Sequence, residues 1–213
     1  VSLVALYMSA GSVSREREDG TLDLVLTTPV TPRAYLWGKL RGLVSFLTML
    51  IAVPVGTVAL ASGYALLGYL AGSDRATYLA RASAPGNAQI THEPLLVLPE
   101  APLLALLVLV PFVALCVAVG MNWSLKARGV MGAVVPAVSI IGALTLVLGF
   151  CGWNAASQIA LVGPIINAFS PATNLVMLID PWDHVGGFAQ NPTFGRISLG
   201  IAAFAAAGGY SLL

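Results

Sequence analysis

Charged residues are scarce in this chain of 213 residues. Asp, Glu, Lys and Arg together make up only 9% of it, against about 25% in soluble domains. Hydrophobic residues make up 58%, and the mean hydropathy is +0.89. This composition excludes intrinsic disorder, a basic nucleic-acid-binding protein and an ordinary cytosolic enzyme, and it indicates an integral membrane protein.

Cysteine is also scarce. The two cysteines, Cys116 and Cys151, lie in or beside apolar stretches and show neither metal-ligand spacing nor a disulfide framework. We expect both to be small packing residues. The chain opens at Val1 within an apolar stretch, without a preceding basic segment or small-residue cleavage site. We therefore expect a fragment that lacks the N-terminal part of a longer protein.

Long stretches without a charged residue alternate with charged connections. A helix needs about 20 apolar residues to cross the ~30 Å hydrocarbon core of a bilayer. The charge-free stretches are residues 1–14, 42–73, 101–125, 129–179 and 197–213. They predict an all-α, polytopic helical membrane protein with five transmembrane helices. We place these helices at about 1–13, 42–70 (with a kink at Pro54), 101–121, 130–150 and 196–213.

The connection before the last predicted helix, residues 151–195, is long and contains many polar residues and prolines. Examples are Asn154, Gln158, Pro164, Asn167 and Pro171. Such residues leave backbone or side-chain groups without partners in hydrocarbon. We therefore expect short helices in or dipping into the membrane interface here; a further full span is the alternative.

Basic residues are distributed unevenly between the two sides of the predicted membrane. The connections 14–41 and 122–129 hold seven of them: Arg15, Arg17, Arg33, Lys39, Arg41, Lys126 and Arg128. The other side holds three: Arg75, Arg81 and Arg196. The positive-inside rule places 14–41 and 122–129 in the cytoplasm. We expect a multi-pass protein of the cell's inner (cytoplasmic) membrane.

The first cytoplasmic segment, residues 14–41, holds four of the nine acidic residues. Residues 15–19 form a charged extension of the first helix, and Gly20 permits a sharp turn after it. Thr31-Pro32 then fits an N-cap followed by proline at the first helical position, so the next helix begins there.

Between these two helices, residues 21–28 are amphipathic. Leu22 and Leu26 fall on one helical face and Asp23 on the other, and Pro29 ends the pattern. The pattern predicts a short helix lying flat on the membrane surface with its polar face toward the cytoplasm. Any interfacial loop can show such a pattern, so it is not specific by itself.

The order of residues in this segment resembles a motif of the ABC-2 type transporter permeases. In that family an acid pair, Gly-Thr-Leu, a further acid, a leucine-rich turn and Thr-Pro precede a Gly-Lys at the foot of the next span. The matching residues are Glu16 and Glu18, Gly20-Thr21-Leu22, Asp23, Leu24–Leu26, Thr28-Pro29 and Gly38-Lys39. Asp23 stands where the family more often has Glu.

The layout of the chain is similar to that family as well. The family has six spans, with the motif between the second and third, so this chain would hold spans two to six. A short basic loop between spans four and five is matched by Asn122–Gly129, and a Ser-Pro before the last span is matched by Ser170-Pro171.

The resemblance implies one permease domain over residues 1–213, incomplete at its N-terminus, with a coupling helix in 14–41 that docks on a separate ATP-binding subunit. The implied coupling interface is Glu16, Glu18, Asp19, Gly20, Thr21, Leu22, Asp23, Leu26 and Pro29, with Lys126 and Arg128 in the second cytoplasmic loop. It also implies a homodimer or heterodimer of permease halves in the lipid bilayer. The small residues of Ala202–Gly209 suit close packing either between or within subunits.

The chain lacks a nucleotide-binding motif. A P-loop requires G-x-x-x-x-G-K-[ST], whereas Gly38-Lys39 is followed by Leu40 and has Arg33 at the first glycine position. We therefore expect no catalytic, cofactor-binding or metal-binding residues, with ATP and magnesium bound by the partner. The expected function is that of a permease subunit that moves a substrate outward, driven by ATP hydrolysis on another chain.

Two alternatives from other classes stay open. An ion-coupled secondary transporter usually keeps ionisable residues at membrane depth. The five charge-free stretches contain none, histidine included, which weighs against that class. A structural membrane-assembly protein is the second alternative, although it would not need a polar helix presented to an ATPase.

Overall fold

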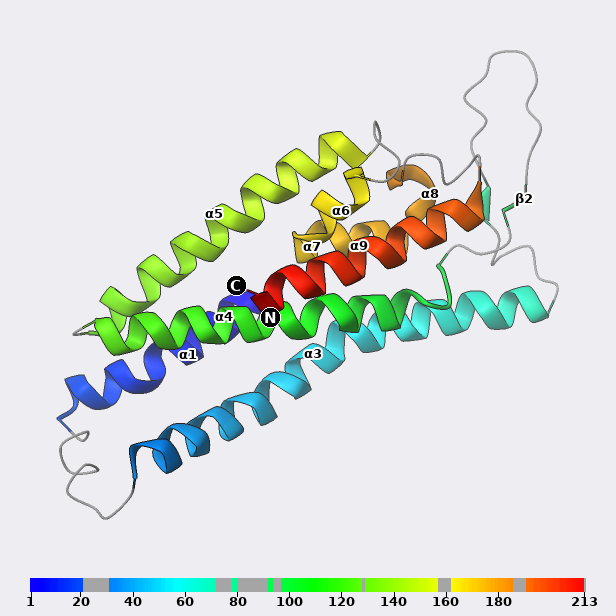
Figure 1. The fold of residues 1–213 in the computed structure, drawn as a ribbon. Helices are drawn as coiled ribbons and strands as arrows, with labels where there is room; N and C mark the ends of the chain where they lie inside the picture. Colours follow the sequence, from blue (N-terminus) through cyan, green and yellow to red (C-terminus); the bar gives the residue numbers. More distant parts are fainter. Residues whose placement is uncertain are drawn as a thin grey trace.

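A computed structural model describes residues 1–20, 31–71, 78–79, 92–93, 97–127, 129–156, 162–185 and 191–212 (Figure 1). Each of the five predicted spans forms a helix: α1 (Ser2–Glu18), α3 (Pro32–Leu70), α4 (Ala101–Lys126), α5 (Val130–Ala156) and α9 (Pro192–Leu212). Between α5 and α9 lie α6 (Val162–Ala168), α7 (Pro171–Ile179) and α8 (Pro181–His184). Between α3 and α4, strands β1 (Tyr78–Leu79) and β2 (His92–Glu93) pair antiparallel. The predicted class, a helical polytopic membrane protein, is confirmed.

Three helices in the described part of the chain are long and apolar enough to cross a bilayer. They are residues 33–68 of α3, all of α4, and residues 130–153 of α5. The helix α1 is shorter, with 17 residues that end in charged side chains, and α9 has 21 residues that include Arg196. Both are close to the ~20 residues that a span needs, as the marginal lengths of the first and last stretches predict.

The helix α4 forms the centre of the bundle. The helices α1, α3, α5 and α9 all pack against it, and Figure 1 shows it running through the middle of the bundle. Half of its most apolar window is buried, against 11% for α3 and 17% for α5. At its middle the Phe112 ring is fully buried, with its centroid 5.2 Å from that of Tyr210 on α9. The rest of the described chain therefore leaves most of the surface of α3 and α5 uncovered.

Small residues bring α1 and α4 into close contact. Gly120 of α4 faces α1 so closely that an added Cβ would clash with the side chain of Ser9. One turn further along, Ser124 Oγ accepts hydrogen bonds from the backbone N–H groups of Val13 (3.2 Å) and Ser14 (3.1 Å). Small side chains and interhelical hydrogen bonds are the usual means of association in lipid, where burial of apolar surface gives little advantage. We call this contact the α1–α4 seam.

The short helices α6 and α7 fold back against the bundle. Asn167 of α6 is 1% exposed, and its Cα would lie 2.7 Å from a Cβ added at Gly152 of α5. Thr173 Oγ1 of α7 donates a hydrogen bond to the Asn167 carbonyl at 2.8 Å. The predicted short helices are confirmed, and they pack against α5, α4 and α9.

The α1–α4 seam predicts opposite effects for the same substitution at two helical glycines. Gly120→Ala should destabilise the protein by about 1–3 kcal/mol, because the new methyl group overpacks the contact with Ser9. Gly200→Ala on α9 is the matched control, since a Cβ there meets no described atom within 4 Å. It should be neutral or stabilising by about 0.5–1 kcal/mol, because alanine favours helix over glycine. Thermal unfolding in detergent measures both, and equal melting temperatures would contradict the seam.

Candidate coupling site

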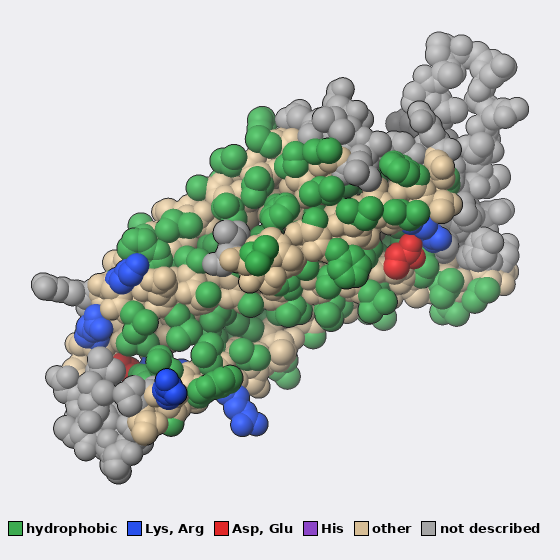
Figure 2. Space-filling model, viewed as in Figure 1, with side chains coloured by type: hydrophobic (Ala, Val, Ile, Leu, Met, Phe, Trp, Pro, Cys, Tyr) green, Lys and Arg blue, Asp and Glu red, His purple; other side chains and the backbone are tan. Residues whose placement is uncertain are grey.

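Charged side chains gather at the end of the bundle where α1 and α4 end and α3 and α5 begin. Figure 2 shows lysine and arginine side chains clustered there. Four consecutive residues of α1, Arg15–Glu18, lie at the centre of this end, and we call them the charged turn. The two segments that the sequence assigns to the cytoplasm, 14–41 and 122–129, meet at this turn through the contacts below. They therefore lie on the same side, as predicted.

Glu16 connects α1 to α3. Its Oε1 lies 2.7 Å from Lys39 Nζ, and its Oε2 accepts a hydrogen bond from the Tyr35 hydroxyl. Lys39 also donates to the carbonyl of Ser12. The Glu16 and Lys39 side chains are 29% and 22% exposed, so solvent screens this ion pair less than it screens a pair on an open surface.

The next two residues cap two other helices. Arg17 donates hydrogen bonds to the carbonyls of Ala127 (3.0 Å) and Leu125 (3.4 Å), at the C-terminus of α4. Glu18 Oε1 accepts the N–H of Val130, the first residue of α5, at 3.1 Å. Both contacts satisfy backbone groups that a helix end leaves without partners, and their charges suit the helix dipoles. One turn of α1 thus binds α3, α4 and α5.

Other charged residues at this end point outward. Arg15 donates to the Tyr7 hydroxyl at 2.5 Å. Lys126 is exposed, with its Nζ 5.8 Å from the centre of the Trp123 ring. Asp19 is exposed and forms no ion pair within the described residues. Gly20 has φ +67°, a left-handed conformation that glycine adopts without strain, which confirms the sharp turn predicted there.

The structure places part of the predicted coupling interface. Glu16, Glu18, Asp19 and Gly20 lie together at the end of α1, on the same end of the bundle as Lys126. The other predicted residues, Thr21, Leu22, Asp23, Leu26, Pro29 and Arg128, lie outside the described residues. The amphipathic coupling helix therefore stays a prediction.

Sequence reasoning missed the partners of the acid pair within the chain. It assigned Glu16 and Glu18 to a surface that faces another protein, and Tyr35 was not singled out. A signal was present, because Tyr35 and Lys39 are four residues apart and so share one face of a helix. Within the described residues, no group of three or more His, Cys, Asp and Glu side chains is arranged to hold a metal ion.

Apolar helices surround the central helix α4, and the charged turn links them at one end of the bundle. This arrangement is that of a multi-pass helical membrane protein. The family model described as "ABC-2 family transporter protein" matches residues 1–212. The chain belongs to the ABC-2 transporter family, and it is the membrane-spanning permease component of an ABC transporter. The resemblance stated from the sequence is thus confirmed. No curated protein and no solved structure matches the chain.

The contact between Glu16 and Lys39 predicts a measurable coupling energy. In a double-mutant cycle of Glu16→Gln and Lys39→Gln, we expect about 1–2 kcal/mol of coupling, between the values for exposed and buried pairs. Asp19→Asn is the matched control, since it removes a charge from the same helix end without breaking an ion pair among the described residues. It should change stability by less than about 0.5 kcal/mol. Unfolding in detergent measures the free energies of all four proteins. If the effects of the two single substitutions on the free energy of unfolding were strictly additive, the contact between Glu16 and Lys39 would be contradicted.

The Glu18 contact predicts a different pattern. Glu18→Ala should destabilise the protein by about 1 kcal/mol, the usual cost of losing a side-chain cap. Glu18→Gln keeps an acceptor oxygen for the Val130 N–H and should retain most of that stability. Gly129→Ala should match Glu18→Ala, because its Cβ would lie 2.5 Å from Glu18 Oε1. The capping role is excluded if all three variants unfold at the wild-type temperature.

Proposed function

We propose that this permease works as an exporter in the inner (cytoplasmic) membrane, on energy from a separate ATP-binding subunit. ATP and magnesium bind to that subunit, and two permease halves, identical or different, form the complete transporter. Residues 1–213 form one permease domain. The single observation that supports this proposal most directly is the charged turn, because one turn of α1 contacts three other helices.

The proposed docking surface consists of the coupling segment 14–41 and the second loop. Asp19, Lys126 and Arg128 would make charged contacts with the ATP-binding subunit, together with Asp23. Leu22 and Leu26 would hold the coupling helix to the membrane domain. Glu16 and Glu18 would act as positioning residues, because their carboxylates already bind Lys39 and the N-terminus of α5.

Movement of the coupling segment would reach the membrane helices through the charged turn. A displacement of residues 19–31 pulls directly on the end of α1 and on the start of α3. The ion pair and the two caps keep α3, α4 and α5 in register with α1. The α1–α4 seam then passes the displacement to the central helix. The helices shift together at one end, which is what alternating access or a lateral path requires.

The rival class of ion-coupled transporters receives no support from the structure. Among the buried residues of the described part there is no Asp, Glu, Lys, Arg or His. The alanines of α9 also bear on the dimer. Ala202, Ala203 and Ala206 are buried inside this subunit, so close packing there occurs within one chain, and a second permease half would use another surface.

The docking surface is tested by charge reversal. The variant Asp19→Lys with Asp23→Lys should reduce co-purification with the neighbouring ATP-binding subunit, and its ATPase stimulation in lipid, about tenfold or more, because like charges would then meet across the interface. Membrane insertion and melting temperature should not change. Glu100→Gln, at the opposite end of α4, is the control and should leave association intact.

The alternative outcomes are also decisive. If no ATP-binding subunit associates with the full-length protein, the coupling proposal fails. A structural membrane-assembly protein and an ion-coupled secondary transporter are then the remaining hypotheses. If an ATPase associates but the double variant binds it as tightly as wild type, the docking surface lies elsewhere on the molecule.

A further inference from the structure

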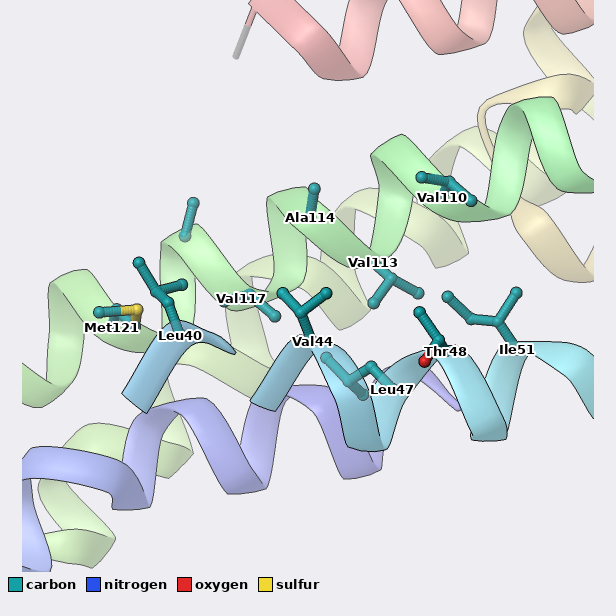
Figure 3. Close-up of a pocket in the computed structure, with 11 residues that line it drawn as sticks. Leu40, Val44, Leu47, Thr48, Ile51, Val110, Val113, Ala114, Val117 and Met121 are labelled. Atoms are coloured by element: carbon teal, nitrogen blue, oxygen red, sulfur yellow. The ribbon is translucent and has the colours of Figure 1, made fainter. Parts of the chain in front are cut away.

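An apolar groove runs between α3 and α4 (Figure 3). It has a volume of about 430 Å³ and extends from Leu40 to Ile51 on α3 and from Met121 to Val110 on α4. Thr48 is the one hydroxyl residue in its lining. Its Oγ1 donates to the Ser45 carbonyl at 2.8 Å, so that hydroxyl is already satisfied within its own helix. The groove therefore suits a hydrocarbon chain and offers little to a polar molecule.

The length of the groove matches one leaflet of a bilayer. Leu40 and Ile51 are 11 residues apart, which is about 16 Å along a helix axis. This is about half of the ~30 Å hydrocarbon core. In Figure 3, Leu40 and Met121 lie at one end of the groove and Ile51 and Val110 toward the other. The Leu40 end points to the charged end of the bundle, so the groove begins at that membrane surface.

Cations without ion-pair partners lie where the groove meets that surface. Arg41 follows Leu40 directly, Arg33 precedes it by seven residues, and Lys126 follows Met121 by five; all three are exposed. None of them forms an ion pair within the described residues. The helices α3 and α4 contain no Asp or Glu. At the end of α1, Glu16 is bound to Lys39, Glu18 caps α5, and Asp19 is exposed without an ion pair among the described residues. Basic side chains of α3 and α4 therefore flank the mouth of the groove.

We propose that this groove binds one anionic phospholipid of the leaflet at the charged end. An acyl chain lies between α3 and α4, and Arg41 and Lys126 bind the phosphate headgroup, with Arg33 further out. Basic residues beside helices on the cytoplasmic face attract anionic lipids in this way. The bound lipid fills the space between α3 and α4 and so supports α3, which has few contacts with the rest of the bundle. This inference requires only membrane insertion and does not depend on the proposed ATPase partner.

The test uses the full-length protein, delipidated in detergent and titrated with dioleoyl phosphatidylglycerol or dioleoyl phosphatidylcholine. Native mass spectrometry counts the lipids bound. Each cation near the headgroup contributes about fivefold in affinity. We therefore expect one phosphatidylglycerol to bind about 25-fold more tightly than phosphatidylcholine, through Arg41 and Lys126.

Variants separate the two parts of the site. Arg41→Gln with Lys126→Gln should weaken phosphatidylglycerol binding about 25-fold and leave phosphatidylcholine binding unchanged. Arg15→Gln, which removes a cation from the same end but away from the groove, is its control. Ala118→Leu should fill the groove and reduce binding of phosphatidylglycerol at least about tenfold. Ala143→Leu, on an exposed position of α5, is the matched control and should have no effect.

Three results would overturn the proposal. Equal affinity for the two lipids would remove the headgroup site. Binding that Ala118→Leu leaves unchanged would show only lipids of the general annulus. Loss of a dimer in Ala118→Leu, seen as a change in the mass of the complex, would show that a second copy of the chain occupies the groove instead.

Discussion

The position of the last turn of α1 is the constraint on which the charged end of the bundle depends, and the ion pair between Glu16 and Lys39 fixes where α1 and α3 meet there. Arg17 reaches the end of α4 and Glu18 the start of α5 only when the last turn of α1 lies between them. Because the groups are partly exposed, their desolvation costs less than in a buried pair, and their attraction is screened less than on an open surface. The charged turn therefore joins the ends of four helices, α1, α3, α4 and α5, without placing a charge inside the membrane.

Inside the membrane the helices need another source of specificity. Lipid tails are as apolar as leucine side chains, so burial of apolar surface does not select one partner helix over another. Gly120 and Ser9 allow close approach, and Ser124 adds two hydrogen bonds to the backbone of α1. The seam and the charged turn lie along the same helix α1. Together they make α1 and α4 one unit, whereas α3 has fewer contacts with the rest of the bundle and lies mainly against α4.

The fold could be predicted from sequence because the bilayer imposes a length and forbids unpaired backbone groups. Thr31-Pro32 also gave the start of α3 correctly, since the Thr31 hydroxyl accepts the Ala34 N–H at 3.4 Å. The partners of Glu16 and Glu18 could not be predicted. They depend on the register of α1 against α3 and α5, which tertiary packing decides. The resemblance to a family motif also led us to expect that both carboxylates face another subunit. Tyr35 alone was too weak a signal to predict its contact with Glu16.

The inward binding of this acid pair changes how force can enter the molecule. A carboxylate that already has an ion-pair partner gains little from a second cation, because the first contact must be broken or shared. Glu16 therefore serves an ATP-binding subunit best by keeping its bond to Lys39, and Glu18 by keeping its cap on α5. Both then form a rigid attachment for the segment that begins at Asp19. The direct contacts then fall to the exposed charges around them. The acid pair therefore transmits motion, and the exposed charges around it recognise the partner. Substitutions at Glu16 and Glu18 should lower the stability of the protein, whereas substitutions at the exposed charges should lower its association with the ATP-binding subunit.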